Sequence, residues 1–252
     1  MISRNARKTR SRNRPPNYSV RTCVNPKSPT LNRSAQEGAS NKSAHLRGGI
    51  RKILEFPSVY GLFNILIRSK GARIQFVKEI IPAKSGSRIL DIGCGDGWIL
   101  EFLPDSVSYV GYDLNPDYID RARSLFGQRA TFVCAAISAD SAPRVSEDQF
   151  DIVLALGVLH HLSDAEAANL CEQAYSHLAV GGVFITYDGV FVPEQSRVAR
   201  FLLSRDRGQA VRTPEGYLAL ASKRFSNVTS QVRSDMLRIP YTNFIMHCVR
   251  ES

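Results

Sequence analysis

The chain has 252 residues, of which 43% are hydrophobic, and this is enough for one sizeable domain with a buried core. Its net charge of +10 comes from the first 52 residues, which carry 13 Lys/Arg and one acidic residue, whereas the other 200 residues have a net charge of −2. No run of about 18 uncharged apolar residues occurs, so the sequence predicts no membrane-spanning helix.

The segment 1–48 is rich in Arg, Ser, Asn and Pro and poor in large apolar residues, so we predict a disordered basic tail before a folded domain at 49–252. Three roles remain open for this tail. It is an upstream extension without function, a basic arm that contacts nucleic acid or acidic surfaces, or an organelle targeting peptide.

The five cysteines are scattered along the chain, with no Cys-x-x-Cys pair and no histidine spacing typical of zinc ligands. This pattern predicts reduced thiols, no metal site and a cytoplasmic location.

Two helices are predicted before the first strand. Apolar residues between Tyr60 and Ile67 follow Pro57 with helical spacing, and a second helix is expected at about Ala72–Ile81, ending before Pro82. We expect these helices to pack over a ligand crevice or to cover an edge of the sheet.

A glycine-rich turn follows the first predicted strand, Ser87–Ile92. The segment Arg88–Gly97 reads R-I-L-D-I-G-C-G-D-G and places a glycine at every second position of the turn. Glycine adopts backbone angles that a Cβ would forbid and lets the chain pass close to a ligand. Apolar residues with helical spacing then predict a helix to about Leu103.

The rest of the chain alternates strands with helices. Asn115 suits the N-cap and Pro116 the first turn of the helix that we predict at Asp117–Phe126. The other predicted elements are strands Val107–Tyr112 and Ala130–Cys134, a loop over 138–149, strand Asp151–Leu156, a helix from Ser163-Asp164 to about Leu178, strand Val183–Tyr187 after a Gly181-Gly182 turn, helices at Pro193–Leu203 and Thr213–Ser222, and strands Val228–Val232 and Phe244–Val249.

This alternation predicts an α/β fold with a mostly parallel sheet and helices on both faces. The last two strands have no room for a crossover helix between them, so they are expected to pair antiparallel.

The glycine turn excludes two nucleotide-binding motifs. A dinucleotide fingerprint needs a third glycine where this chain has Trp98, and a phosphate-binding loop needs a Gly-Lys-Ser/Thr sequence that is absent. The turn carries Asp91 and Asp96 and no Lys or Arg, so it suits a ligand with positive charge better than a pyrophosphate.

With these features the chain resembles class I S-adenosylmethionine-dependent methyltransferases, over about Ile53–Val249. I-L-D-I-G-C-G-D-G matches motif I, and Y-V-G-Y-D-L closes the second strand with an acidic residue. F-D-I-V-L-A-L-G-V-L-H-H-L and L-A-V-G-G-V-F-I-T-Y-D match the fourth-strand and fifth-strand regions. The resemblance implies a Rossmann-like seven-stranded sheet with an antiparallel last strand, methyl transfer, and S-adenosylmethionine as cofactor.

The resemblance also implies the cofactor-binding residues. Asp113 would hold the two ribose hydroxyls, because one carboxylate can accept two charge-assisted hydrogen bonds. Many relatives have an acidic residue for adenine after the third strand, but this chain has Ala135 and Ala136 there, so adenine would depend on apolar packing, backbone groups, Ser138 or Asp140. The complete predicted set is Asp91, Gly93, Cys94, Gly95, Gly97, Asp113, Leu114, Ala135, Ala136 and Leu156.

Catalytic candidates follow the fourth and fifth strands, where open α/β sheets bind ligands. His160 or His161 would act as a general base, because histidine titrates near neutral pH. The alternative is that both residues hydrogen-bond the loop or shape the pocket. Tyr187-Asp188 would contact the substrate or simply end the strand, and the charged segment Arg205–Gly208 would hold an anionic substrate or remain solvated.

The acceptor is predicted to be a small molecule with an oxygen, nitrogen or carbon nucleophile. No Asp/Asn-Pro-Pro-Tyr/Phe sequence is present, and the nearly neutral domain argues against nucleic acid. Two alternatives stay open: a catalytically silent cofactor-binding module, and a nucleic-acid or protein methyltransferase that uses the basic tail. The oligomeric state is not predicted.

Overall fold

The computed structural model of the chain describes residues 70–137, 149–205, 210–237 and 239–252. Several sequence predictions lie outside these ranges. They are the tail at 1–48, the helix at Tyr60–Ile67, most of the loop at 138–149, and most of the segment Arg205–Gly208. None of the helices in the described part is long and apolar enough to cross a membrane.

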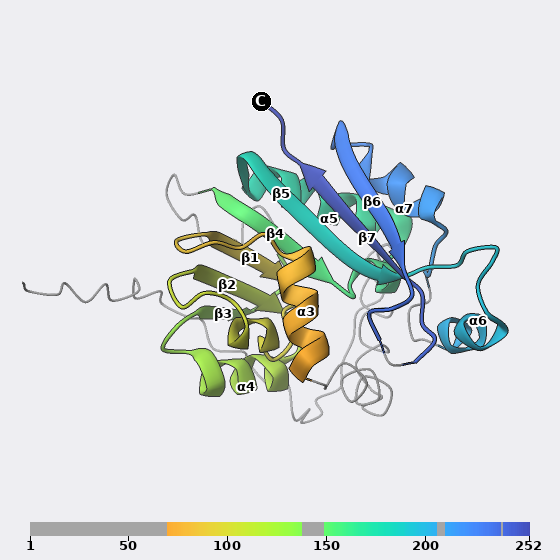
Figure 1. Cartoon of the computed structure of the whole chain (residues 1–252). Coiled ribbons are helices and arrows are strands. Elements are labelled where there is room, and N and C mark those ends of the chain that lie inside the picture. The colour runs from red at the N-terminus through yellow and green to blue at the C-terminus, as the bar shows by residue number, and fades with distance from the viewer. Residues whose placement is uncertain (1–69, 138–148, 206–209, 238) are drawn as a thin grey trace, which may run out of the picture. The chain divides into compact units, whose positions relative to one another are not determined.

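A seven-stranded sheet organises the described residues, in the order β3-β2-β1-β4-β5-β7-β6 (Figure 1). The pairs among β1 to β5 are parallel, and β7 runs antiparallel between β5 and β6. The predicted mostly parallel sheet with an antiparallel last strand is therefore confirmed. The strands are β1 Arg88–Ile92, β2 Ser108–Asp113, β3 Thr131–Cys134, β4 Phe150–Leu156, β5 Leu178–Gly189, β6 Asn227–Arg233 and β7 Asn243–Val249.

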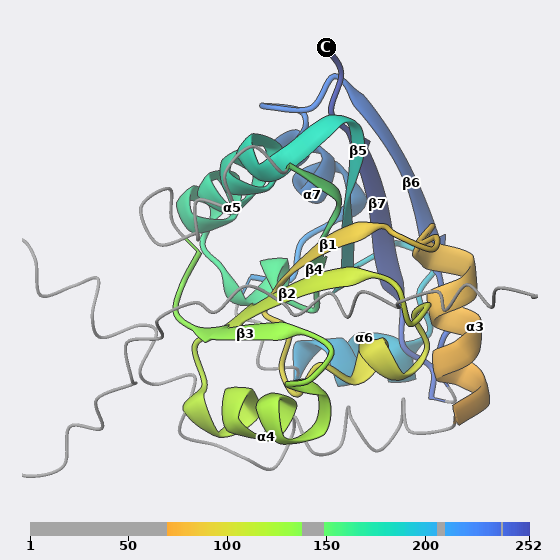
Figure 2. The same ribbon diagram turned by 90° about the vertical axis from the view of Figure 1, so that its left-hand side faces the viewer.

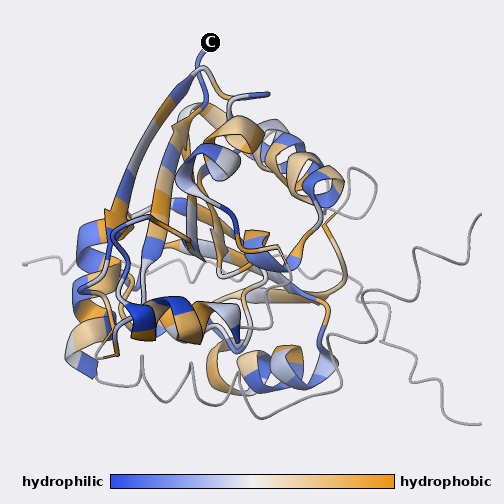
Figure 3. Cartoon of the chain, turned by 90° about the vertical axis from the view of Figure 1, so that its right-hand side faces the viewer, coloured by the Kyte–Doolittle hydropathy of each residue, from blue (hydrophilic) through white to orange (hydrophobic). Residues whose placement is uncertain are grey.

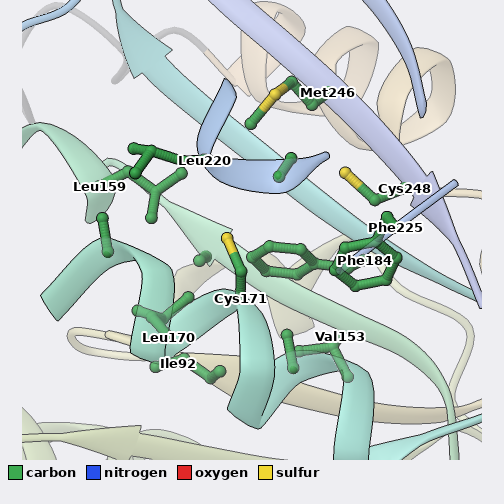
Figure 4. Packing of buried hydrophobic residues seen from close by; sticks show 14 of the residues in the cluster. Ile92, Val153, Leu159, Leu170, Cys171, Phe184, Leu220, Phe225, Met246 and Cys248 are labelled. Carbon is green, nitrogen blue, oxygen red and sulfur yellow. The ribbon is translucent and has the colours of Figure 1, made fainter. Parts of the chain in front are cut away.

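Helices cover both faces of the sheet (Figure 2). Side chains of α3 (Lys70–Ile80) and α4 (Pro116–Phe126) pack into one hydrophobic cluster, and side chains of α5 (Asp164–His177) and α7 (Pro214–Ala221) pack into the other. Alternate residues of each strand join opposite clusters, as the period of two in a strand requires. In β4, for example, Leu154 faces the α3 side, and Val153 faces α5 with Cys171 and Phe184 (Figure 4).

Local capping signals set several helix boundaries. The Asn115 side chain accepts a hydrogen bond from the Asp117 amide at the start of α4, as predicted. Ser163 and Glu166 form a reciprocal capping box at the start of α5, and the Thr213 side chain caps α7.

The helix predicted from the glycine turn to Leu103 was wrong in type and length, because the chain forms a 3₁₀-helix, η1, only at Trp98–Glu101. Pro104 stops any continuation. The guanidinium of Arg129 donates hydrogen bonds to the carbonyl oxygens of Leu100, Leu103 and Pro104, which takes up carbonyl groups that a longer helix would use.

Two further boundaries differ from the predictions. Gly181-Gly182 does not precede the fifth strand but lies inside β5, where the pairing with β4 shifts register between Phe150 and Ile152. Arg250 bonds to both glycines through its backbone and so holds this irregular part of the strand. Helix α6 begins at Arg197 rather than at Pro193, with Ser196 as its N-cap.

A buried carboxyl lies between β1 and β2, one strand position before the glycine turn. Asp91 is 3% exposed and its Oδ2 accepts a hydrogen bond of 2.6 Å from the Tyr109 hydroxyl. Burial raises the pKa of Asp91 to about 7, the Tyr109 hydrogen bond opposes that rise, and the negative charge of Asp113 adds to it.

This pKa predicts a stability change with pH. Between the unfolded value of 3.8 and about 7, the folded protein binds more protons than the unfolded chain, so the contribution of Asp91 to the free energy of unfolding falls as pH rises through this window. Asp91→Asn removes that dependence. As pH rises from 4 to 8, the free energy of unfolding of the variant should increase relative to that of wild type by on the order of 3–4 kcal/mol. Urea denaturation without cofactor measures this difference at each pH.

The matched control is Asp120→Asn, which changes an exposed carboxylate on α4 and should shift stability by less than about 0.5 kcal/mol at each pH. Parallel stability curves for wild type and Asp91→Asn would contradict the assignment of a raised pKa to this carboxyl.

Candidate active site

The carboxyl ends of β1 and β4 meet where the strand order reverses, since the chain passes from β1 outward to β3 and then returns to add β4 on the other side of β1. Such a reversal leaves a crevice at the carboxyl edge of an open parallel sheet. The predicted site residues lie along this edge, after β1, β2, β3, β4 and β5.

The glycine turn after β1 is fastened to β2 by its own backbone. The amides of Gly93 and Cys94 donate hydrogen bonds of 2.7 and 3.0 Å to the carbonyl oxygen of Tyr112. Gly93, Gly95 and Gly97 have φ values of 77°, 55° and 71°, a region that favours glycine. A Cβ at Gly93 would also lie 2.6 Å from a methyl group of Val158, so the loop after β4 closes against the turn.

Asp113, the last residue of β2, is held by two backbone amides. Its Oδ2 accepts a hydrogen bond of 2.9 Å from Gly95, and its Oδ1 accepts one of 2.8 Å from Asn115. Burial raises the pKa of Asp113, while these amides favour the charged form. A carboxylate offers about four lone-pair sites, so each oxygen retains the capacity to accept one more donor.

The other residues predicted to bind cofactor lie around the same edge, with different exposures. Asp91 lies beneath the turn with Tyr109, and Cys94 is buried with its thiol directed to the Gly95 carbonyl. Leu114 is exposed beside β3, where its carbonyl oxygen accepts a weak hydrogen bond from the Cys134 thiol. Ala135 and Ala136 follow β3, and Leu156 ends β4.

His160 is buried and is held by Asp188 at the end of β5. The short 3₁₀-helix η2, Leu159–His161, follows β4 and brings the His160 ring to Asp188. His160 Nδ1 and Asp188 Oδ1 are 2.8 Å apart, and the His160 amide donates to the same oxygen at 3.2 Å. The His161 ring lies 4.1 Å from the His160 ring, measured between centroids. A histidine with one nitrogen on a carboxylate has a fixed orientation and tautomer.

A second buried polar pair occupies the opposite face of β5 at the same end. Tyr187 and Asn243 lie on the face that α3 covers, since Tyr187 pairs with Ile245 and Asn243 is two residues away on β7. Asn243 is 0% exposed, and its amide lies close enough to the Tyr187 hydroxyl to lower the pKa of Tyr187 against the larger rise that burial causes. The sequence analysis missed Asn243, and its one signal was an amide side chain directly before an apolar strand.

The described residues contain no group of three or more His, Cys, Asp or Glu side chains that could hold a metal ion. The polar groups that the site offers include the carboxylates of Asp91 and Asp113 near the turn and two buried polar pairs at the end of β5.

Residues 89–182 match the family model of a methyltransferase domain. An uncharacterized methyltransferase from Synechocystis sp. is 29% identical over 139 residues, which are 53% of this chain and 64% of that protein. A ubiquinone biosynthesis O-methyltransferase from Hydrogenovibrio crunogenus is 32% identical over 124 residues, 48% of this chain and 50% of that protein. The match thus spans about half to two thirds of these relatives' length.

Among solved structures, the N-methyltransferase NodS from Bradyrhizobium japonicum has the same fold, with a TM-score of 0.55 and 17% identity over 74% of this chain and 100% of that one. The glycine turn, the acidic end of β2, the strand order and these matches agree with one another. Residues 89–182 therefore carry a methyltransferase domain that is similar to the class I S-adenosylmethionine-dependent methyltransferases.

Proposed function

We propose that this protein transfers a methyl group from S-adenosylmethionine to a small-molecule acceptor. The observation that carries the proposal is the fixed position of the Asp113 carboxylate at the crevice between β1 and β4. The amides of Gly95 and Asn115 each donate to one of its oxygens. Each oxygen can accept one further donor, which fits the adjacent hydroxyls of a ribose.

The surroundings of Asp113 fit the rest of the cofactor. The turn has no Lys or Arg of its own. Asp96 forms an ion pair of 3.4 Å with Arg121 of α4, but the carboxyl groups of Asp91 and Asp113 lie beside the turn and favour a sulfonium and an amine over a phosphate. Gly93, Gly95 and Gly97 would let the backbone approach the methionyl part. Leu114, Ala135, Ala136 and Leu156 would form apolar walls, with the adenine held by packing and backbone groups.

The residues at the end of β5 would bind the acceptor and accept the proton that it loses during methyl transfer. The cofactor, when bound, supplies a methyl group activated by positive sulfur. The protein then has to hold the acceptor in line and accept its proton where the nucleophile is protonated. We assign His160 to this proton transfer, because the Asp188 carboxylate at Nδ1 fixes the orientation of the ring and would stabilise the imidazolium that forms; His161, packed against it, would shape the pocket.

A small acceptor is favoured by the relatives and by the charge of the domain. The Hydrogenovibrio relative is named for ubiquinone biosynthesis, and the net charge of −2 over residues 53–252 argues against nucleic acid as the acceptor. That relative is an O-methyltransferase and NodS is an N-methyltransferase, so the resemblance leaves the methylated atom open.

The test is turnover. The purified full chain, supplied with S-adenosylmethionine and a panel of phenols, catechols, amines and carboxylic acids, should release S-adenosylhomocysteine with at least one acceptor class, measured by mass spectrometry. Calorimetric binding of the cofactor without turnover of any acceptor would instead support the silent binding module. Turnover only with nucleic acid or protein would contradict the proposal.

Asp113→Ala should weaken cofactor binding by about 2–3 kcal/mol, because it removes the carboxylate that would accept from the ribose. Isothermal titration calorimetry measures this change. The control is Asp117→Ala, four residues further on in the exposed first turn of α4, which should leave the affinity within about twofold. Equal affinities for wild type and a folded Asp113→Ala protein would refute the ribose assignment.

Asp188→Asn should lower kcat at least about tenfold with the best acceptor of the panel, because an amide no longer fixes the His160 tautomer. Cofactor affinity should stay unchanged, and the acidic limb of the kcat–pH profile should move to lower pH, since an imidazolium would lose its anionic partner. A drop in thermal stability with an unmoved pH profile would show that Asp188 and His160 only support the loop.

A further inference from the structure

Helix α6 (Arg197–Ser204) lies just beyond the carboxyl end of β5, at the edge of the sheet that carries the site (Figure 1). Its Leu203 side chain packs against Gly189, where a Cβ would come within 2.5 Å of it, and against Leu237 and Tyr241. Ser196 caps the helix by accepting from the Ala199 amide. The inner face of α6 is thus firmly attached to the fold.

The apolar face of α6 is wider than the part that the fold buries. Ala199 and Leu203 are buried, but Val198 and Phe201 are 56% and 57% exposed and lie three residues apart on the outer side. The other large exposed hydrophobic side chains of the described part, Leu114, Leu125, Val180 and Val232, lie singly on different elements. Single exposed apolar residues are ordinary, whereas an apolar pair on one turn indicates a contact surface.

Arginines surround this exposed pair. Arg197, Arg200 and Arg205 form no ion pair with a described carboxylate, and Glu194 is the one acidic residue in the segment 190–205. The guanidinium of Arg200 lies 5.4 Å from the Phe191 ring centroid, and that of Arg205 lies 5.3 Å from the Phe201 centroid. A groove on this face is lined by Phe191, Arg197, Arg200, Phe201 and Ser204.

Apolar and basic side chains therefore share one outward face, and Figure 3 shows strongly hydrophobic and strongly hydrophilic residues side by side on this helix. This combination is the signature of a helix that lies in the headgroup region of a bilayer, with apolar side chains inserted and arginine side chains extended to anionic headgroups. A symmetric contact with a second copy would bring the same arginines against one another, which disfavours that occupant.

We propose that α6 is a peripheral docking element for an anionic lipid surface, with Val198 and Phe201 inserted and Arg197, Arg200 and Arg205 on the headgroups. This contact would place the carboxyl edge of the sheet, and hence the site, next to the membrane surface. The proposed membrane contact of α6 does not depend on which acceptor the protein methylates.

Phe201→Trp gives a direct test in the full chain. On addition of vesicles of phosphatidylcholine with phosphatidylglycerol, the emission of the new tryptophan should move to shorter wavelength, and lipids brominated on their acyl chains should quench it. Trp98, the single tryptophan of the wild type, supplies the background. Adding Arg197→Gln and Arg200→Gln should weaken partitioning on the order of 20-fold, since each arginine near an anionic surface contributes about fivefold.

The matched control is Leu125→Trp, which places a tryptophan at a position on α4 that is also 57% exposed. This design separates insertion of α6 from attraction of the basic segment 1–52, because electrostatic attachment of that segment would leave the tryptophan of Phe201→Trp unquenched. Vesicle-bound protein without quenching at position 201 would overturn the proposal. A spectral shift that depends on protein concentration without vesicles would also overturn it and indicate a second copy.

Discussion

The attachment of the glycine turn to the end of β2 is the constraint on which the site depends. Three consecutive amides of the turn, those of Gly93, Cys94 and Gly95, donate to the Tyr112 carbonyl or to the Asp113 carboxylate. These bonds bring the backbone close to Asp113 and fix its Oδ2, while the Asn115 amide fixes its Oδ1. The turn can take this path because its glycines adopt positive φ values. At Gly93 a larger residue is also excluded by space, since a Cβ there would clash with Val158.

The electrostatics of the site follow from burying acidic groups under that turn. Asp91 is removed from water and has the Tyr109 hydroxyl as hydrogen-bond donor, and the nearby charge of Asp113 disfavours its ionisation further. The fold therefore sacrifices some stability near neutral pH to keep acidic groups beside the crevice. A cationic ligand such as S-adenosylmethionine would relieve this cost.

A few residues at the end of β5 both hold the buried polar groups near the crevice and support helix α6. Asp188 points to the α5 face and holds His160, Asn243 lies beside Tyr187 on the α3 face, and the same strand end supports α6 through Gly189. Two polar pairs on opposite faces of one strand end are costly to bury, so their position next to the crevice is the feature that most favours an acceptor site there.

The sequence by itself determined the local features, namely the turns, helix caps and strands that depend on residues close together in the chain. It predicted the glycine turn, the capped start of α4, six of the seven strands within one or two residues and, by resemblance, Asp113 at the end of β2. It failed where distant contacts decided the outcome. Hydrogen bonds from Arg129 took up the carbonyl groups after the short helix η1, and backbone bonds from Arg250 held Gly181-Gly182 within β5. The His160–Asp188 pair joins residues 28 positions apart, and the burial of Asn243 depends on strand register. Local backbone preferences are readable from a few adjacent side chains, whereas these contacts exist only once the sheet and its register have formed.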